Sequence, residues 1–195
     1  RPLHRSAYAD GKIAALLGLV LGLIAVAALM AVTTLLLLPA LRLTSAQWLQ
    51  LAGFMAISAL YMACFGLIGL ASAAWAKSET VGLLLPVTLW LTASFILPQL
   101  TANLNPTAAI NPISALAAAP DTGFFNLSGA LLGPLSVADA YKFASANLLD
   151  YLPQGLSSPS VISPVASLIL LTLAAGGLAW RALTRMAMTQ GEFDV

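Results

Sequence analysis

The side chains that could do chemistry are few and lie far apart in the sequence. The one histidine, His4, lies in a basic stretch near the start, and the one cysteine, Cys64, lies within an apolar run. Neither a His-Glu-x-x-His motif nor a Cys-x-x-Cys pair occurs, so the sequence offers no metal site. We therefore expect no catalytic residue, no metal and no bound cofactor. We interpret Cys64 as a free, buried thiol that packs as a small apolar side chain.

One short segment is similar to a nucleotide-binding motif. Gly11-Lys12 matches the end of a phosphate-binding loop, in which a lysine contacts the phosphates. However, Ile13 stands where a serine or threonine must bind magnesium, and Ser6 stands where the first glycine belongs. The match is rejected, and we expect the chain not to be an enzyme that hydrolyses ATP itself.

Long intervals without charge define the expected elements. The chain is 60% hydrophobic and 8% charged, whereas soluble domains carry roughly 25% charged residues. About 20 apolar residues suffice for a membrane-spanning helix. Because backbone groups in lipid need internal partners, we predict an all-α, polytopic bundle of transmembrane helices. Its four spans are predicted at residues 13–38, 49–75, 81–98 and 161–180.

The third predicted span is the least regular of the four. It is short, and Pro86 interrupts it. Proline removes a backbone donor and kinks a helix. We expect this span to be bent, or to extend toward Leu100.

Basic residues predict how the chain crosses the membrane. Six lie on one side of the predicted spans (Arg1, Arg5, Lys12, Lys77, Arg181 and Arg185) and two on the other (Arg42 and Lys142). The excess of Lys and Arg on cytoplasmic loops places the N-terminus, the 76–80 loop and the tail 181–195 in the cytoplasm. Trp48, Trp75 and Trp180 fall at predicted interfaces, and Trp90 is expected to face another helix. The predicted location is a bacterial cytoplasmic membrane, crossed several times.

Residues 99–160 form a predicted extracytoplasmic segment with short helices at 112–119 and 136–152. Ser136 and Asp139 form a cap at the start of the second helix. Its apolar face carries Val137, Tyr141, Ala144, Leu148 and Leu152, and Asp139, Lys142, Ser145 and Asp150 lie on or beside the opposite face. We expect this helix to lie on the membrane surface or to cap the bundle. A structural lid is favoured over an element that contacts substrate.

Small residues within the first span predict close helix packing. Gly18 and Gly22 form a G-x-x-x-G motif in an apolar run, which lets a second helix approach closely. We favour packing within the chain over dimerisation. The second span is similarly rich in glycine and serine.

The predicted spans contain no acidic or basic residue. Intramembrane charges normally mark proton relays and ion pathways, so their absence argues against a proton-coupled carrier or an ion channel. It is what we expect if a separate subunit supplies the energy for transport. The net charge of +1 gives no electrostatic case for binding nucleic acid.

Residues 1–12 precede the first span as a basic segment led by Arg1-Pro2. By charge alone, such a segment serves as a positive-inside anchor. It resembles the cytoplasmic stretch of type-2 ABC exporter permeases, which reads Arg-Pro, then Arg, then a short helix, then Gly-Lys at the start of a span. The matching residues are Arg1, Pro2, Arg5, Gly11 and Lys12. The order of spans is also similar, most of all to the permease branch associated with multicopper-enzyme maturation.

The resemblance implies a membrane-spanning permease subunit of an ABC exporter. In the family this stretch follows the second of six spans, so we expect these four spans to be the last four of six. Residues 1–12 would contact a separate ATPase subunit, a second permease copy or paralogue would complete the pathway, and the lipid bilayer would surround both. The alternative is a membrane scaffold or assembly factor that binds an extracytoplasmic partner around Phe124, Phe125 and the 136–152 helix. The long external segment prevents transfer of a substrate class.

Overall fold

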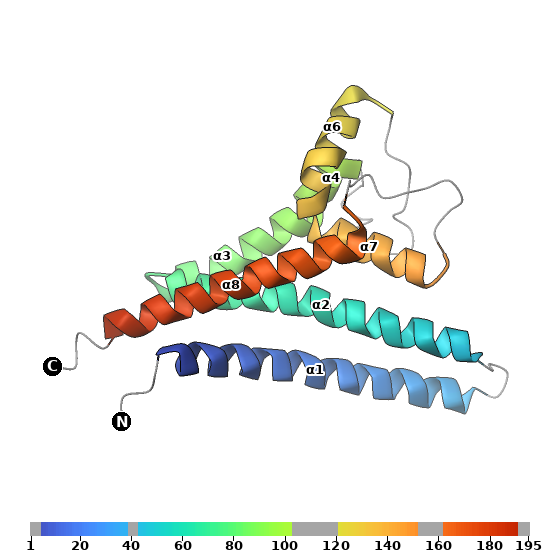
Figure 1. Cartoon of the computed structure of the whole chain (residues 1–195), viewed down its shortest axis with the longest axis horizontal. Helices are drawn as coiled ribbons and strands as arrows, with labels where there is room; N and C mark the ends of the chain where they lie inside the picture. The colour runs from blue at the N-terminus through green and yellow to red at the C-terminus, as the bar shows by residue number, and fades with distance from the viewer. Residues whose placement is uncertain (1–4, 39–42, 103–120, 152–161, 191–195) are drawn as a thin grey trace. The chain divides into compact units, whose positions relative to one another are not determined.

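The computed structural model describes residues 5–38, 43–102, 121–151 and 162–190 (Figure 1). All regular secondary structure in these ranges is helical, which confirms the predicted fold class. Four helical stretches in the described ranges are long and apolar enough to cross a membrane: Arg5–Leu37, Ser45–Trp75, Glu79–Thr101 and Pro164–Met186. Each overlaps one predicted span. The chain therefore has the four candidate spans expected of a polytopic membrane protein.

Helices α1 (Arg5–Leu37) and α2 (Ser45–Trp75) are each continuous over their whole length. No break separates the predicted coupling segment from the predicted span, because α1 already begins at Arg5. A capping box starts α2, in which Thr44 Oγ1 accepts a hydrogen bond from the Gln47 backbone N–H at 3.3 Å and Gln47 Oε1 accepts from the Thr44 N–H at 2.8 Å. This pair satisfies N–H groups that a helix start otherwise leaves free.

The third candidate span is composite. It consists of α3 (Glu79–Leu91), a π-helical stretch η1 (Thr92–Ile96) and α4 (Leu97–Ala102). The helix continues through Pro86, although the proline leaves the Gly82 carbonyl without its usual helical donor. The departure from α-helical geometry lies at η1 instead. The predicted extension toward Leu100 is confirmed, since the candidate span ends at Thr101.

The described residues divide into two compact units. The first unit runs to Leu83 and resumes at Thr172, so it contains α1, α2, the start of α3 and most of α8 (Pro164–Gln190). In it α2 packs on both other long helices. Gly66 of α2 lies so close to α1 that a Cβ there would be 3.2 Å from the Leu16 methyls, and a Cβ at Gly176 of α8 would be 3.7 Å from Leu67.

The second unit comprises Leu84–Leu171. It contains α6 (Gly123–Leu132), the 3-10 turn η2 (Gly133–Leu135) and α7 (Val137–Leu148), besides η1 and α4. Helix α6 packs on α4, where Ser128 Oγ donates a hydrogen bond to the Leu100 carbonyl at 2.6 Å. Helix α6 was not predicted. One sequence signal for it is the N-cap Thr122, whose hydroxyl accepts from the Phe125 N–H at 3.4 Å. Another is the helical spacing of Phe124, Leu127 and Leu131.

Helix α7 confirms one prediction and corrects another. Ser136 is its N-cap, and its hydroxyl accepts from the Asp139 N–H at 3.3 Å as expected. The prediction of one buried and one exposed face is wrong, because residues 137–140 and 142–146 are all buried. Alanines at 138, 140, 144 and 146 let neighbouring segments approach from several sides. The predicted 112–119 helix and Leu152 lie outside the described residues.

Two predictions about single side chains have opposite outcomes. Cys64 is a free thiol with 1% of its surface exposed, as predicted. Trp90, which was expected to face another helix, is instead among the exposed large side chains of the described residues. It is 41% exposed, and its ring meets Phe95 of the same composite span edge to face at 5.8 Å. Trp90 and Phe95 lie about one helical turn apart, so their rings pack against each other within the same composite span.

Candidate functional site

One end of the first unit gathers most of its basic residues. Figure 1 shows that the start of α1, the α2–α3 turn and the last turns of α8 lie at the same end of this unit. We call this the basic end, and its exposed cations are Arg5, Lys12, Lys77, Arg181 and Arg185. Asp10 and Glu79 are the described carboxylates there. The basic end is therefore a cationic surface made from two helices, α1 and α8, and the α2–α3 turn.

The basic end is held together by a contact between α1 and α8. Trp180 Nε1 donates a hydrogen bond to Asp10 Oδ1 at 3.2 Å. Beside it, the Lys12 ammonium lies 5.7 Å from the centre of the Tyr8 ring, within range of a cation–π interaction. Trp180 was predicted only as a membrane-interface residue, and no pattern in the sequence connects it with Asp10. The contact leaves Lys12 at the surface.

The predicted ATPase-contact residues separate into two groups. Arg1 and Pro2 lie outside the described residues. Arg5, Gly11 and Lys12 are exposed positions of α1, and a Cβ at Gly11 would meet nothing within 4 Å. The described members of this set thus lie on a solvent-facing part of a helix that continues into the first candidate span.

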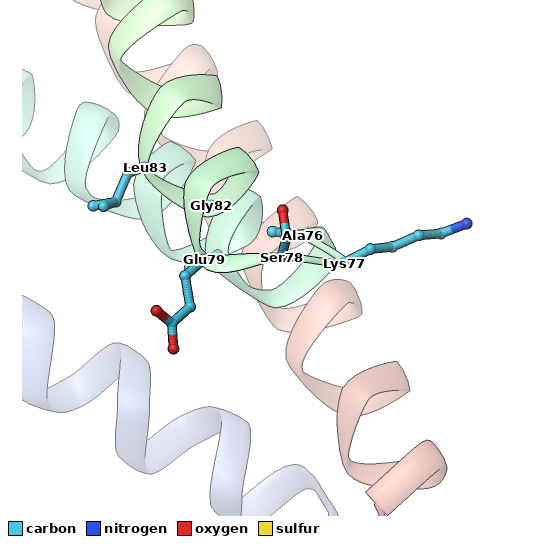
Figure 2. Close-up of a pocket in the computed structure, with 7 residues that line it drawn as sticks. Ala76, Lys77, Ser78, Glu79, Gly82 and Leu83 are labelled. Atoms are coloured by element: carbon cyan, nitrogen blue, oxygen red, sulfur yellow. The ribbon is translucent and has the colours of Figure 1, made fainter.

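The α2–α3 turn adds a shallow pocket to the basic end. It is lined by Ala73, Ala76, Lys77, Ser78, Glu79, Gly82 and Leu83. Figure 2 shows the Lys77 and Glu79 side chains leaving the turn in different directions. The turn is tight, because a Cβ at Gly82 would lie 3.3 Å from Ala76 Cβ. Ser78 starts α3, since its hydroxyl accepts from the Val81 N–H at 3.4 Å.

Gly18 and Gly22 lie on an exposed face of α1 in the part of the chain that the structure describes. A Cβ at either position would meet no atom of the described chain within 4 Å, and both glycines are exposed. No described segment covers the two glycines, and the interpretation that they pack inside the chain stays a prediction. Gly66 provides a close approach between described helices, with Leu16 as its neighbour. At 100° per residue, Gly18 lies nearly opposite the buried Val20 on α1.

A buried polar cluster lies in the second unit, and sequence analysis did not find it. We use this name for Thr101 of α4 with Ser136, Asp139 and Lys142 at the start of α7. The exposed fractions of Thr101, Asp139 and Lys142 are 0%, 3% and 4%. Thr101 Oγ1 lies 2.7 Å from Asp139 Oδ2. This contact joins residues 38 positions apart, so periodicity along α7 could not reveal it.

Burial dominates the electrostatics of this cluster. It raises the pKa of the Asp139 carboxyl, and the neighbouring Thr101 and Ser136 hydroxyls and the Lys142 charge lower it by less. Burial likewise lowers the pKa of the Lys142 ammonium, and the Asp139 charge opposes that shift. Both shifts favour the neutral forms, as expected for ionisable groups removed from water. Within the described residues Asp139 Oδ1 has no hydrogen-bond donor.

The described residues bring together no group of three histidine, cysteine or acidic side chains that could hold a metal ion. No protein-family model, curated protein or solved structure matches the chain. Its two features of functional interest are thus the basic end, which is a surface, and the buried polar cluster, which is an internal site.

Proposed function

We propose that the chain is the membrane-spanning permease subunit of an ATP-driven ABC exporter, and that a separate subunit hydrolyses ATP. The observation that carries the proposal is the basic end. It combines Arg5 and Lys12, which match the exporter permeases in sequence, with Lys77, Arg181 and Arg185. Because cytoplasmic loops of membrane proteins carry the excess of Lys and Arg, this end would face the cytoplasm. It would be the surface that an ATPase reaches.

The continuity of α1 supports a role in coupling. A helix that begins at Arg5 and ends at Leu37 transmits a displacement along its length, since its backbone hydrogen bonds are unbroken. The Trp180–Asp10 hydrogen bond links the start of α1 to α8. Closure of two ATPase subunits on ATP would move α1 and α8 together and open the pathway.

The partner permease would pack against the lipid-facing surface of the spans. The exposed face of α1 that carries Gly18 and Gly22 fits this role, because small residues let two helices approach closely in a membrane. The spans that line the pathway would need no ionisable residue of their own, since ATP supplies the driving force. The residues between Lys12 and Arg42 and those between Arg42 and Lys77 meet this condition.

Co-purification with the ATPase tests the proposal. The full-length protein is captured from detergent-solubilised membranes, and the eluate is assayed for ATP hydrolysis and for a partner with a phosphate-binding loop. We expect both with the unmodified protein. We expect a loss of about tenfold or more with Arg5→Glu combined with Lys12→Glu, because like charges facing each other across an interface cost several kcal/mol.

The control is Asp150→Lys, which reverses a charge by the same magnitude per site, with the opposite sign, at an exposed position of the second unit. It should leave the captured ATPase unchanged. Absence of any ATPase with the unmodified protein would rule out the permease assignment. Equal capture with and without the two glutamates would remove Arg5 and Lys12 from the contact.

The second unit favours one alternative, a membrane scaffold that binds an extracytoplasmic protein. Helix α6 exposes a stripe of large apolar side chains, with Phe124, Leu127 and Leu131 between 60% and 65% exposed. Helix α7, the other predicted part of this surface, is buried and would not take part. Crosslinks from α6 to an extracytoplasmic protein that form equally with and without ATP would support the scaffold.

A further inference from the structure

The contact between Thr101 and Asp139 depends on which of the two side chains donates the hydrogen between them. Thr101 Oγ1 lies 2.9 Å from the Leu97 carbonyl and 2.7 Å from Asp139 Oδ2. Both are hydrogen-bonding distances, yet a hydroxyl has a single hydrogen to donate. Only one of the two oxygens can receive it. The other contact needs a different hydrogen if it is to be a hydrogen bond.

An ionised Asp139 satisfies this geometry poorly. The Thr101 hydroxyl would then donate to Oδ2, and the neighbouring Ser136 hydroxyl would also favour the anion. Oδ1, however, would be an anionic oxygen without a hydrogen-bond donor among the described residues. An unpaired buried anion is far more costly than an unpaired neutral oxygen. A protonated Asp139 satisfies it better. The carboxylic O–H donates to Thr101 Oγ1, Thr101 donates to the Leu97 carbonyl, and Oδ1 is a neutral carbonyl oxygen.

The surroundings of Asp139 supply little compensating charge. Among the described residues, the segments that pack most on α7 or contact Asp139 are η1, η2 and α4, and none of the three contains a charged residue. The remaining positive potential is the partial charge at the N-terminus of α7, whose first turn carries Asp139. The second unit has four charged side chains in all, namely Asp121, Asp139, Lys142 and Asp150. Lys142, one helical turn beyond Asp139, is the only cation among them. It is itself 4% exposed, so its charged form is also disfavoured.

We propose that Asp139 is a proton-binding site that holds α7 against the end of the third span. In the packed state the carboxyl carries a proton and bridges to Thr101. Loss of that proton leaves a buried anion and loosens the contact between α7 and α4. This inference is independent of the permease assignment, because it concerns the packing of the second unit alone.

The direction of the pH dependence follows from linkage. Burial raises the pKa of Asp139 in the packed state. A packed state that binds a proton more tightly than the open state is most stable below the open-state pKa, and it loses this stability as the pH rises through the packed-state pKa. Burial lowers the pKa of the Lys142 ammonium, so its linkage has the opposite sign: the packed state gains stability as the pH rises toward the open-state pKa of the lysine. Tyr151, just beyond α7, has a raised pKa and ionises only in alkali.

Hydrogen exchange of the full-length protein in lipid nanodiscs tests the proposal. The readout is the protection of the α7 backbone amides, corrected for the intrinsic pH dependence of exchange. In the unmodified protein, protection should fall as the pH rises, by up to tenfold per pH unit across the titration of Asp139. Asp139→Asn imitates the protonated carboxyl and should keep α7 protected without that slope. Asp150→Asn, at an exposed carboxyl next to α7, should behave like the unmodified protein.

Lys142→Met distinguishes a proton from a salt bridge. If Asp139 is protonated, removal of the lysine charge should change α7 protection at neutral pH by less than about threefold. If the two residues form an ion pair, Lys142→Met leaves the buried Asp139 carboxylate without the lysine charge, and Asp139→Asn leaves the buried Lys142 ammonium without the aspartate charge. Protection would then drop by more than about a hundredfold. That result, or a slope that persists in Asp139→Asn, overturns the proposal.

Thr101 and the carboxyl group provide two further readouts. Thr101→Val should weaken α7 protection and Thr101→Ser should restore it, because only the hydroxyl accepts the carboxyl hydrogen. Infrared difference spectra should show a protonated carboxyl C=O band at neutral pH that Asp139→Asn removes. Absence of that band, with α7 packed, would also refute the proposal.

Discussion

Asp139 and Lys142 are three residues apart on α7, a spacing that fits a solvated helix face and a buried polar cluster equally well. Charged side chains are rarely buried without a partner, so the sequence predicts an exposed face for both residues. The partner is Thr101, 38 positions earlier in the chain. Such a contact leaves no trace in the periodicity of either segment. Burial of a charged pair therefore had to be seen in the folded chain.

Gly66 and Leu16 allow a prediction at the same scale. Since a Cβ at position 66 would lie 3.2 Å from the Leu16 methyls, Gly66→Val should overpack the α1–α2 contact. We expect a loss of about 1–3 kcal/mol, measured as a lower thermal unfolding midpoint in detergent. Leu16→Ala in the same chain should recover part of the loss.

The control for this pair is Gly177→Val, since a Cβ there would meet nothing within 4 Å. It should have a much smaller effect on the midpoint. If Gly66→Val and Gly177→Val destabilised the protein equally, the effect would come from valine in a helix and not from the contact with Leu16.

At the scale of elements, α1 and α7 differ in exposure from what their residue patterns predict. The glycine stripe of α1 was expected to be inside the chain and no described segment covers it, whereas α7 was expected at the surface and is buried. The reason is that amphipathicity depends on the surrounding solvent. In lipid an apolar face can be outermost, and a helix rich in alanine can be buried on all sides.

The exposed face of α1 predicts self-association. Gly18→Leu with Gly22→Leu should reduce pairing of differently labelled copies in nanodiscs or detergent, measured by energy transfer. The same change should not unfold α1, because leucine has a higher helix propensity than glycine. Ala27→Leu, at an exposed position on the opposite side of α1 from Gly18, is the control. Equal pairing in all three proteins would show that the partner does not use this face.

At the scale of the whole molecule, charge is concentrated at the ends of long apolar stretches. The proposals for function and for topology both rest on this pattern. The apolar stretches offer no charged surface to a soluble partner, so such a partner would bind at the basic end. The proposed role of a subunit that receives energy from a partner rests on the order of the candidate spans and on the basic end.

Topology can be measured directly. In a Cys64→Ala background, Lys77→Cys should be protected from a membrane-impermeant maleimide added to intact cells, and Asp150→Cys should be labelled. Both parent side chains are exposed, so burial does not confound the result. The expectation follows from the excess of Lys and Arg on the side of Lys77. Labelling of both sites from the same side would contradict the four-span topology.

The four spans, the buried thiol and the Ser136 cap could be determined from the sequence alone. Long intervals without charge have one stable solution in a bilayer, since unpaired backbone groups and charges in hydrocarbon are too costly. Caps and short apolar runs are likewise local, so their residues suffice to define them. The continuous helix at Arg5–Leu37 could be predicted in part, because no residue from Arg5 to Lys12 prevents a helix.

Only the tertiary structure decided which helix faces are covered. It joined Asp10 to Trp180 and Thr101 to Asp139, it placed a close approach of α1 and α2 at Gly66, and it buried α7. Each of these depends on two segments meeting across the chain. The residue pattern of one segment shows that a helix face is apolar or made of small side chains. It does not show whether protein or lipid covers that face, because the same residue types suit both environments.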